Sequence, residues 1–98
     1  MREKHNMNEE QAKIVALRAL AYLVGDEDAL QRFMDLSGID STELRAGADD
    51  PAMLGGVLDY FLGNETELLE MCTATDMAGE EPGRARHSLA GNKYDEWS

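Results

Sequence analysis

The sequence has little of what metalloproteins and nucleotide-binding enzymes use, and each shortage excludes a class of site. Its 98 residues contain one cysteine and two histidines, which are too few ligands for a structural zinc site. A single cysteine forms no intrachain disulfide, which is typical of proteins from a reducing compartment. Gly55-Gly56 is not followed by the lysine and Ser/Thr of a phosphate-binding loop. The sequence therefore assigns no catalytic, cofactor-binding or metal-binding residue.

Basic residues are scarce and unevenly distributed. The chain has 9 Lys and Arg against 20 Asp and Glu, which gives a formal net charge of −11. Residues 46–83 contain no base at all. An acidic surface of this kind repels phosphate backbones and anionic lipid headgroups. We therefore expect no binding to nucleic acid or to a membrane, and a protein partner held by charge is expected to be basic.

Long apolar runs and strand patterns are also missing. The longest apolar run, residues 14–24, contains Arg18 and is shorter than a membrane span. The first residues lack the apolar core of a signal peptide, so we expect a cytoplasmic protein. No window alternates β-branched and polar residues as a strand does. These absences favour an all-α fold.

The chain does contain apolar residues at three- and four-residue spacing, in segments separated by helix-capping residues. They predict a compact bundle of five to six short helices. The predicted helices cover residues 8–24, 26–37, a short stretch around 44, 51–62, 64–74 and one or two turns within 84–89. Around them we predict a frayed N-terminus (1–7), a single helical domain (8–90) and a flexible acidic-aromatic tail (91–98).

The same spacing predicts which side chains form the core. In the first helix the inward stripe comprises Ile14, Leu17, Leu20, Ala21 and Val24, and it is widened around the helix by Val15, Tyr22 and Leu23. In the later helices the inward positions are Leu30, Phe33, Met34, Leu36, Met53, Leu54, Val57, Leu58, Phe61, Leu62, Leu68, Leu69, Met71 and Cys72. Met77 is expected in the core as well, where a thioether fills irregular gaps. A buried, inert Cys72 thiol is favoured over a Cys72–His87 nucleophile pair.

The numerous acids lie mainly where helices are predicted to begin. A carboxylate in the first turn caps free backbone N–H groups and interacts favourably with the helix dipole. Asp40 with Glu43 has the spacing of a capping box, and Asn64 with Glu67 is expected to cap the fifth helix. The acids assigned to capping are Asp26, Asp40, Asp50, Glu65, Glu67, Glu80 and Glu81.

Two adjacent glycines, Gly55 and Gly56, lie inside the predicted helix 51–62. Each costs up to ~1 kcal/mol of helix stability relative to alanine, so their presence needs a reason. Close packing against a neighbouring helix, near Ala16 and Ala19, is the favoured interpretation. The alternative is a helix that lines a groove.

A weak internal repeat relates residues 12–48 to residues 50–86 at an offset of 38 positions. Leu20–Glu27 aligns with Leu58–Glu65, and both segments end one helix and begin the next. A fixed offset of this size indicates a supersecondary unit used twice. The shared pattern also suits two unrelated helical hairpins with the same caps, and both interpretations remain open.

Three stretches of the sequence together resemble a family of short, uncharacterised helical proteins. The family is found mainly in alphaproteobacteria and is classified as a domain of unknown function. The three stretches are Ala16–Leu23, Gly38-Ile-Asp with Leu44-Arg45, and Asp50–Leu54 leading into Val57–Leu62. The resemblance covers roughly residues 12–75. Beyond it, a polar segment broken by Gly and Pro replaces an expected Ala-rich final helix. The resemblance implies an all-helical fold and no catalytic residues.

Function is left open by these observations, and three hypotheses follow. The first is a small acidic, non-enzymatic interaction or regulatory domain that binds a partner through residues 46–83, a groove beside Gly55-Gly56, or the tail. The second is a small-molecule-binding or enzymatic domain, with a pocket between the helical units lined by Tyr22, Tyr60 and Cys72. The third is a structural homodimer in which Phe33 or Phe61 becomes buried across a two-fold axis.

Overall fold

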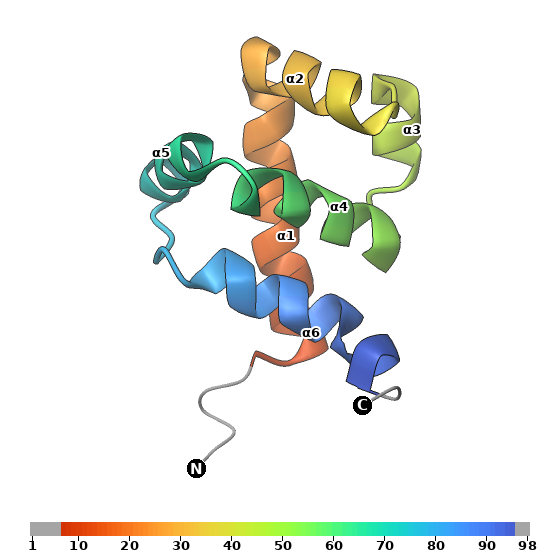
Figure 1. Cartoon of the computed structure of the whole chain (residues 1–98), viewed down its shortest axis with the longest axis vertical. Helices are drawn as coiled ribbons and strands as arrows, with labels where there is room; N and C mark the ends of the chain where they lie inside the picture. The colour runs from red at the N-terminus through yellow and green to blue at the C-terminus, as the bar shows by residue number, and fades with distance from the viewer. Residues whose placement is uncertain (1–6, 96–98) are drawn as a thin grey trace.

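Six helices joined by short connections form the fold (Figure 1). A computed structural model describes residues 7–95, with side chains to Leu89. Within this range no strand is present, and the all-α fold that the sequence predicts is confirmed. The helices are α1 (Glu9–Gly25), α2 (Glu27–Ser37), α3 (Ser41–Ala46), α4 (Pro51–Leu62), α5 (Glu65–Thr75) and α6 (Glu81–Asp95).

Side-chain caps begin the first five helices and explain why the chain breaks where it does. In each case a side-chain oxygen accepts a hydrogen bond from a backbone N–H of the first turn, which has no partner inside the helix. The capping residues are Asn8, Asp26, Asp40, Asp50 and Asn64. The predicted capping box of Asp40 and Glu43 is formed, and Pro51 occupies the first turn of α4.

The centre of the core lies where α1, α4 and α6 pack against one another. α1 runs through the length of the molecule, and α4 and α6 cross it one above the other (Figure 1). α2 packs on α1, α5 packs on both α1 and α4, and α3 adds a single buried side chain, Leu44. The largest fully buried side chains include Phe61, Leu23, Leu54 and Leu58.

The buried face of α1 differs in part from the one that the apolar spacing predicts. Leu20 is buried, as are Val15 and Leu23 at the edge of the predicted stripe, whereas Ile14 is 54% exposed and Leu17 40%. The residues that α1 does bury are Ala12, Val15, Ala16, Ala19, Leu20 and Leu23. Because four of its turns carry apolar residues on both sides, periodicity does not choose between the two faces. The face rich in alanine is the one that lets the neighbouring helices approach closely.

The order of the helices follows the internal repeat, but of the equivalent helices only α2 and α5 agree in length. α2 and α5 each have 11 residues and begin at equivalent positions, after Gly25-Asp26 and Gly63-Asn64 respectively. Both also end on a left-handed residue, Gly38 with φ 77° and Asp76 with φ 59°. The packing is not symmetric, however, since α6 packs on both α1 and α4 while its counterpart α3 has only six residues.

The C-terminal helix is longer than the sequence predicts. One or two turns were expected within residues 84–89, yet α6 begins at Glu81 and its backbone includes residues 91–95 of the expected tail. Pro82 lies in the first turn, where a helix tolerates proline. Pro82, Ala85 and Leu89 are buried at helical spacing, so the core holds this helix in place. Ser88 Oγ also donates to the Met7 carbonyl oxygen at 2.7 Å.

The expected frayed residues 1–6 and tail residues 96–98 lie outside the described residues, and the domain limits remain a prediction.

Candidate functional site

A row of four aromatic rings joins the two helical units. Tyr60 of α4 lies between Phe33 of α2 and its own neighbour Phe61, with ring centroids 5.7 Å and 5.2 Å away and near-perpendicular rings. Tyr22 of α1 completes the row, 6.0 Å from Phe61. Edge-to-face pairs of this kind contribute about 0.5–1.5 kcal/mol each beyond their burial. Tyr60 is thereby held in a fixed position between α2 and α4.

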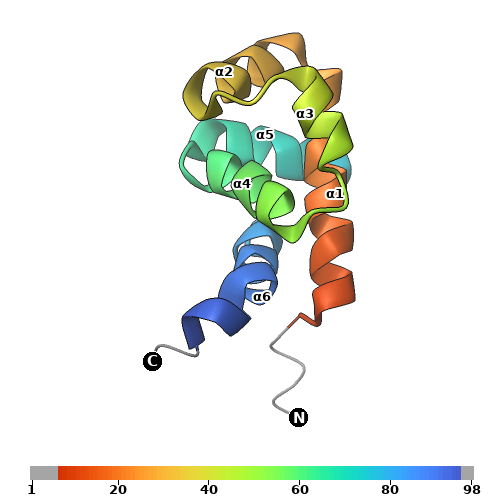
Figure 2. The same ribbon diagram turned by 90° about the vertical axis from the view of Figure 1, so that its right-hand side faces the viewer.

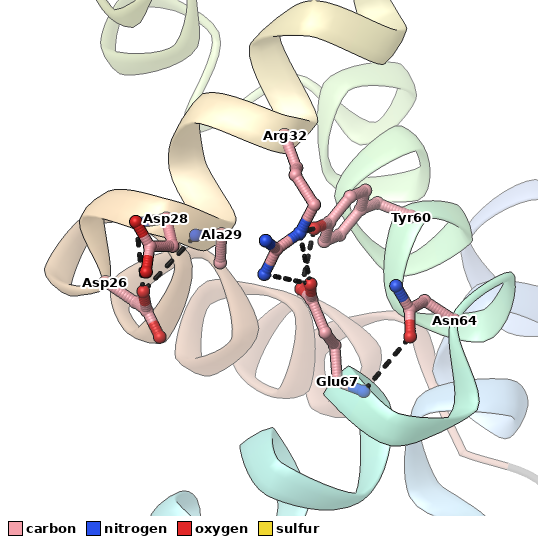
Figure 3. Close-up of polar contacts among 7 residues, drawn as sticks. All are labelled: Asp26, Asp28, Ala29, Arg32, Tyr60, Asn64 and Glu67. Atoms are coloured by element: carbon pink, nitrogen blue, oxygen red, sulfur yellow. Dashed lines mark hydrogen bonds and ion pairs between the residues drawn. The ribbon is translucent and has the colours of Figure 1, made fainter.

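A buried carboxylate, Glu67 of α5, joins α5 to α2 and α4 by polar contacts (Figure 3). The Tyr60 hydroxyl donates to Glu67 Oε1 at 2.6 Å, and the Arg32 guanidinium forms an ion pair with Glu67 Oε2. Glu67 is only 7% exposed. A carboxylate at this depth needs such partners, because burial without them costs several kcal/mol.

The role of Glu67 differs in part from the predicted one. The Asn64 side chain does accept from the Glu67 backbone N–H at 3.2 Å, so Asn64 caps α5 as expected. The Glu67 carboxylate, however, faces Arg32 and Tyr60 (Figure 3). In this position the carboxylate has two donors, the Arg32 guanidinium and the Tyr60 hydroxyl, whereas a capping box would offer it one backbone N–H.

Tyr60 and Arg32 are held in their ordinary protonation states by this cluster. Burial, and next the hydrogen bond to Glu67, raise the pKa of the Tyr60 hydroxyl. Hydrogen bonds to Tyr60 and Glu67 raise the pKa of the Arg32 guanidinium. At neutral pH the phenol therefore keeps its proton and the guanidinium its charge, and neither acts as a base or a nucleophile.

A groove of about 300 Å³ opens beside this cluster, between α2 and α4. Its size is at the lower end of the range of ligand-binding pockets. We call it the α2/α4 groove. The residues that line it are Arg32, Phe33, Leu36, Ser37, Gly56, Asp59, Tyr60, Gly63 and Asn64. Leu36, predicted to be buried, is instead 78% exposed.

The two glycines of α4 have different surroundings. For Gly55 the favoured interpretation, close packing against a neighbouring helix, is confirmed, but its nearest neighbour is Arg86 of α6 and not Ala16 or Ala19. A Cβ on Gly55 would lie 3.2 Å from a guanidinium nitrogen of Arg86 in α6. A Cβ on Gly56 would meet no atom within 4 Å, because Gly56 faces the groove. For Gly56 the alternative interpretation, a helix that lines a groove, is the correct one.

Both charged residues that line the groove already have partners of opposite charge. Arg32 is paired with Glu67, and Asp59 accepts two bonds from Arg86, at 2.6 Å from Nε and 3.0 Å from a terminal nitrogen. A bidentate pair of this geometry fixes both side chains. The groove therefore presents mainly neutral and apolar surface.

Of the three residues predicted to line a pocket between the units, only Tyr60 does so. Cys72 lines a second hollow of about 480 Å³ next to the α5–α6 connection, and Tyr22 lines neither. Cys72 is a buried, free thiol, as predicted, and burial raises its pKa. The phenylalanines offered for a dimer contact are already buried within one chain, Phe33 at 2% and Phe61 at 0% exposure, so that part of the dimer hypothesis is wrong.

Neither a metal-binding cluster nor a membrane-spanning helix is found among the described residues. Within the part of the chain that the structure describes, no group of three or more His, Cys, Asp or Glu could hold a metal ion. No helix among the described residues combines the length and the apolar content that a membrane crossing requires.

Comparison with known proteins yields one match. The model of a family described as a protein of unknown function, DUF3572, matches residues 9–92. The match includes residues 76–92, which the sequence suggested to depart from the family pattern, and these residues form most of α6. No curated protein and no solved structure matches the chain.

Proposed function

Because the chain belongs to this family, which supplies no activity to transfer, we propose that it is a non-enzymatic interaction domain whose α2/α4 groove binds a protein partner. The observation that carries this proposal is Gly56. A glycine inside a helix costs up to ~1 kcal/mol relative to alanine, and no neighbouring atom requires it here. A groove that must remain open supplies the missing reason.

The composition of the groove indicates what part of a partner it would hold. Its charged residues are neutralised within the chain, and its remaining lining includes the apolar side chains of Phe33 and Leu36. A desolvated charge would find no free counterpart there. The occupant is therefore an apolar side chain, inserted as an anchor beneath Leu36 and against the Tyr60 ring.

Charges on α2, beside the groove, favour basic residues next to that anchor. α2 carries Glu27, Asp28 and Asp35 against one base, Arg32, which is already paired with Glu67. The acid of α4, Asp59, is paired with Arg86 and adds nothing to this charge. Complementary charge mainly accelerates association and selects the partner, and salt weakens both effects. We take the reducing cytoplasm as the compartment, since Cys72 is an unpaired buried thiol.

Filling the groove tests the proposal. Gly56→Leu places a side chain where no atom stands within 4 Å of the Cβ, and leucine favours the helix. Ala74→Leu is the matched control, because Ala74 is an exposed position of α5 outside the groove. Random peptides displayed on phage are selected on the unmodified chain, and the dissociation constants of the enriched peptides are measured for all three proteins.

We expect enriched peptides with one apolar anchor flanked by Lys or Arg, bound at least ten-fold more weakly by Gly56→Leu and equally by Ala74→Leu. Equal binding by all three folded proteins would contradict the proposal. Circular dichroism and thermal unfolding show beforehand that both variants are folded.

A small-molecule ligand is a second candidate, because a volume of about 300 Å³ is within the range of ligand pockets. A thermal-shift screen against metabolites separates the two. A ligand at a hundred times its dissociation constant adds ~2.7 kcal/mol of stability. A shift that Gly56→Leu abolishes supports a small molecule, and the absence of any shift leaves the peptide groove as the interpretation to pursue.

A further inference from the structure

The outer face of α1 carries apolar residues that the described part of the chain leaves largely exposed. Ile14, Leu17 and Val24 are 54%, 40% and 39% exposed, and Ala21 between them is exposed as well. α4 and α6 lie on the opposite side of α1, which runs along one edge of the molecule (Figure 2). Scattered exposed apolar residues need no explanation, whereas a continuous row on one helix does.

The spacing of these residues has the form of a helix-pairing seam. The intervals from Ile14 to Leu17, Ala21 and Val24 are three, four and three residues, which is the alternation of the a and d positions of a heptad. At 100° per residue the four side chains fall within one narrow stripe of the helix surface. We call these four residues the α1 seam. It suits a second helix laid along α1.

The α1 seam has a base on each side. Lys13 and Arg18 are the charged residues within its span, and helical geometry puts one on each side of the stripe. The acids of α1, Glu9 and Glu10, lie in its first turn, before Ile14, and Glu10 is in line with the seam. In a chain with a net charge of −11, two flanking bases suit a partner with acidic flanks.

We propose that the α1 seam binds an amphipathic helix of another protein, with apolar residues at three- and four-residue spacing and Asp or Glu on both flanks. This inference is independent of the α2/α4 groove, since no residue of the seam lines that groove.

A second copy of the chain fits the seam less well. Two copies would each carry a net charge of −11, and each seam would present Lys13 and Arg18 to the same bases of the other. Like charges across an interface oppose pairing. An anionic membrane is disfavoured because the 20 acids of this small domain would be brought to the same surface.

Two synthetic helical peptides probe the seam directly. Both have leucine at every a and d position over three heptads, and they differ only in having Glu or Lys at every e and g position. Identical flanking charges hinder each peptide from pairing with itself. Dissociation constants for the fluorescein-labelled peptides are measured by anisotropy at low and at physiological salt.

We expect the Glu peptide to bind at least ten-fold more tightly than the Lys peptide, and less tightly as salt rises. Ile14→Asp should weaken this binding at least ten-fold. Leu69→Asp, the matched control at a 53% exposed residue of α5, should leave it unchanged. A Lys13→Glu, Arg18→Glu double variant should reverse the preference between the two peptides.

Three outcomes would overturn the proposal. The first is equal binding of both peptides, or equal loss in the Ile14 and Leu69 variants. The second is a dimer in sedimentation equilibrium that Ile14→Asp dissociates, which would assign the seam to a second copy. The third is binding to phosphatidylglycerol vesicles that Ile14→Asp abolishes. Gly56→Leu should bind the Glu peptide normally, so failure of the groove proposal and failure of this one are distinguishable.

Discussion

Glu67 contacts three residues from three helices or their caps through hydrogen bonds and an ion pair. Its side chain joins Arg32 of α2 to Tyr60 of α4, and its backbone N–H is capped by Asn64. α2 and α4 belong to different helical units, so the position of one relative to the other depends on this carboxylate and on the Phe33–Tyr60 ring contact. The shape of the groove between them depends on the same residues.

Removing this carboxylate should therefore destabilise the protein more than removing its exposed neighbour. Glu67→Ala leaves the Tyr60 hydroxyl without its acceptor and Arg32 without its partner, and we expect a loss of about 1–3 kcal/mol in the free energy of unfolding. Glu70→Ala, at an exposed position of the same helix, should remain within about 0.5 kcal/mol of the unmodified chain. Urea denaturation measures both free energies of unfolding. Equal losses in the two variants would show that the contacts of Glu67 with Arg32 and Tyr60 do not stabilise the fold.

The hydroxyl of Tyr60 should make stability depend on pH in the alkaline range. Its pKa is raised above 10.0 in the folded state, by burial first and the hydrogen bond to Glu67 second. The folded state thus holds the proton more tightly than the unfolded state. The resulting stabilisation is complete below pH 10.0 and is lost as the pH rises from there through the folded-state pKa.

Unfolding free energies measured in urea between pH 8 and pH 11 test this sign. We expect a fall in stability above pH 10 that is smaller in Tyr60→Phe, which has no ionisable hydroxyl at that position. Some of the fall remains in the variant, because burial also raises the pKa of Tyr22 and of Cys72, whose contribution is lost from about pH 9 upward. Identical pH profiles for the two proteins would refute a role for Tyr60.

At the scale of the elements, the equivalent ends of α2 and α5 differ in one informative way. Both end in the left-handed region, α2 on Gly38 and α5 on Asp76, with φ of 77° and 59°. Glycine adopts this conformation without strain, whereas other residues pay about 1–2 kcal/mol for it. The two positions therefore allow opposite substitutions at matched sites.

Gly38→Ala should lower the free energy of unfolding by about 1 kcal/mol, and Asp76→Gly should raise it by up to ~1 kcal/mol. No atom lies within 4 Å of the Cβ position of Gly38, so conformational strain is the main effect at that site. Thermal unfolding of the two variants measures both changes. Destabilisation by both substitutions would indicate that the Asp76 side chain has a role of its own.

The sequence predicted those features of the helices that depend on neighbouring residues, and it did not predict those that depend on packing between helices. The caps at Asp26, Asp40 and Asn64 were predictable because the bonds span two or three residues. The buried face of α1 was not, because both faces are apolar and only the packing of α4 and α6 selects one. The same packing extends α6 beyond the turns that its polar sequence predicts.

The site follows the same rule. Gly56 was the one residue from which the sequence could predict the groove, because a glycine inside a helix lowers its stability and a groove-lining helix is one explanation for it. The Arg32–Glu67 pair joins residues 35 positions apart in the chain, and neither residue type at its position points to the other. Leu36 and Leu69 follow the apolar spacing of their helices and are nevertheless exposed, at 78% and 53%.

At the scale of the whole molecule, the two proposed surfaces both contain exposed apolar residues and differ in the charges beside them. The α2/α4 groove lies beside the acids of α2, whereas the α1 seam is bordered by Lys13 and Arg18. A domain with one acidic and one basic-bordered surface could connect a basic segment of one protein to an acidic helix of another. That arrangement would suit an adaptor better than an enzyme.

Affinity capture from cells that make this chain tests the central claim, that the α2/α4 groove binds a partner, most directly. Unmodified chain, Gly56→Leu and Ala74→Leu serve as baits at low and at high salt. The account predicts one stoichiometric partner on the unmodified and Ala74→Leu baits, reduced at high salt and missing from Gly56→Leu. Recovery of the same partner in equal amount on all three baits, or recovery of every bait alone, would contradict it.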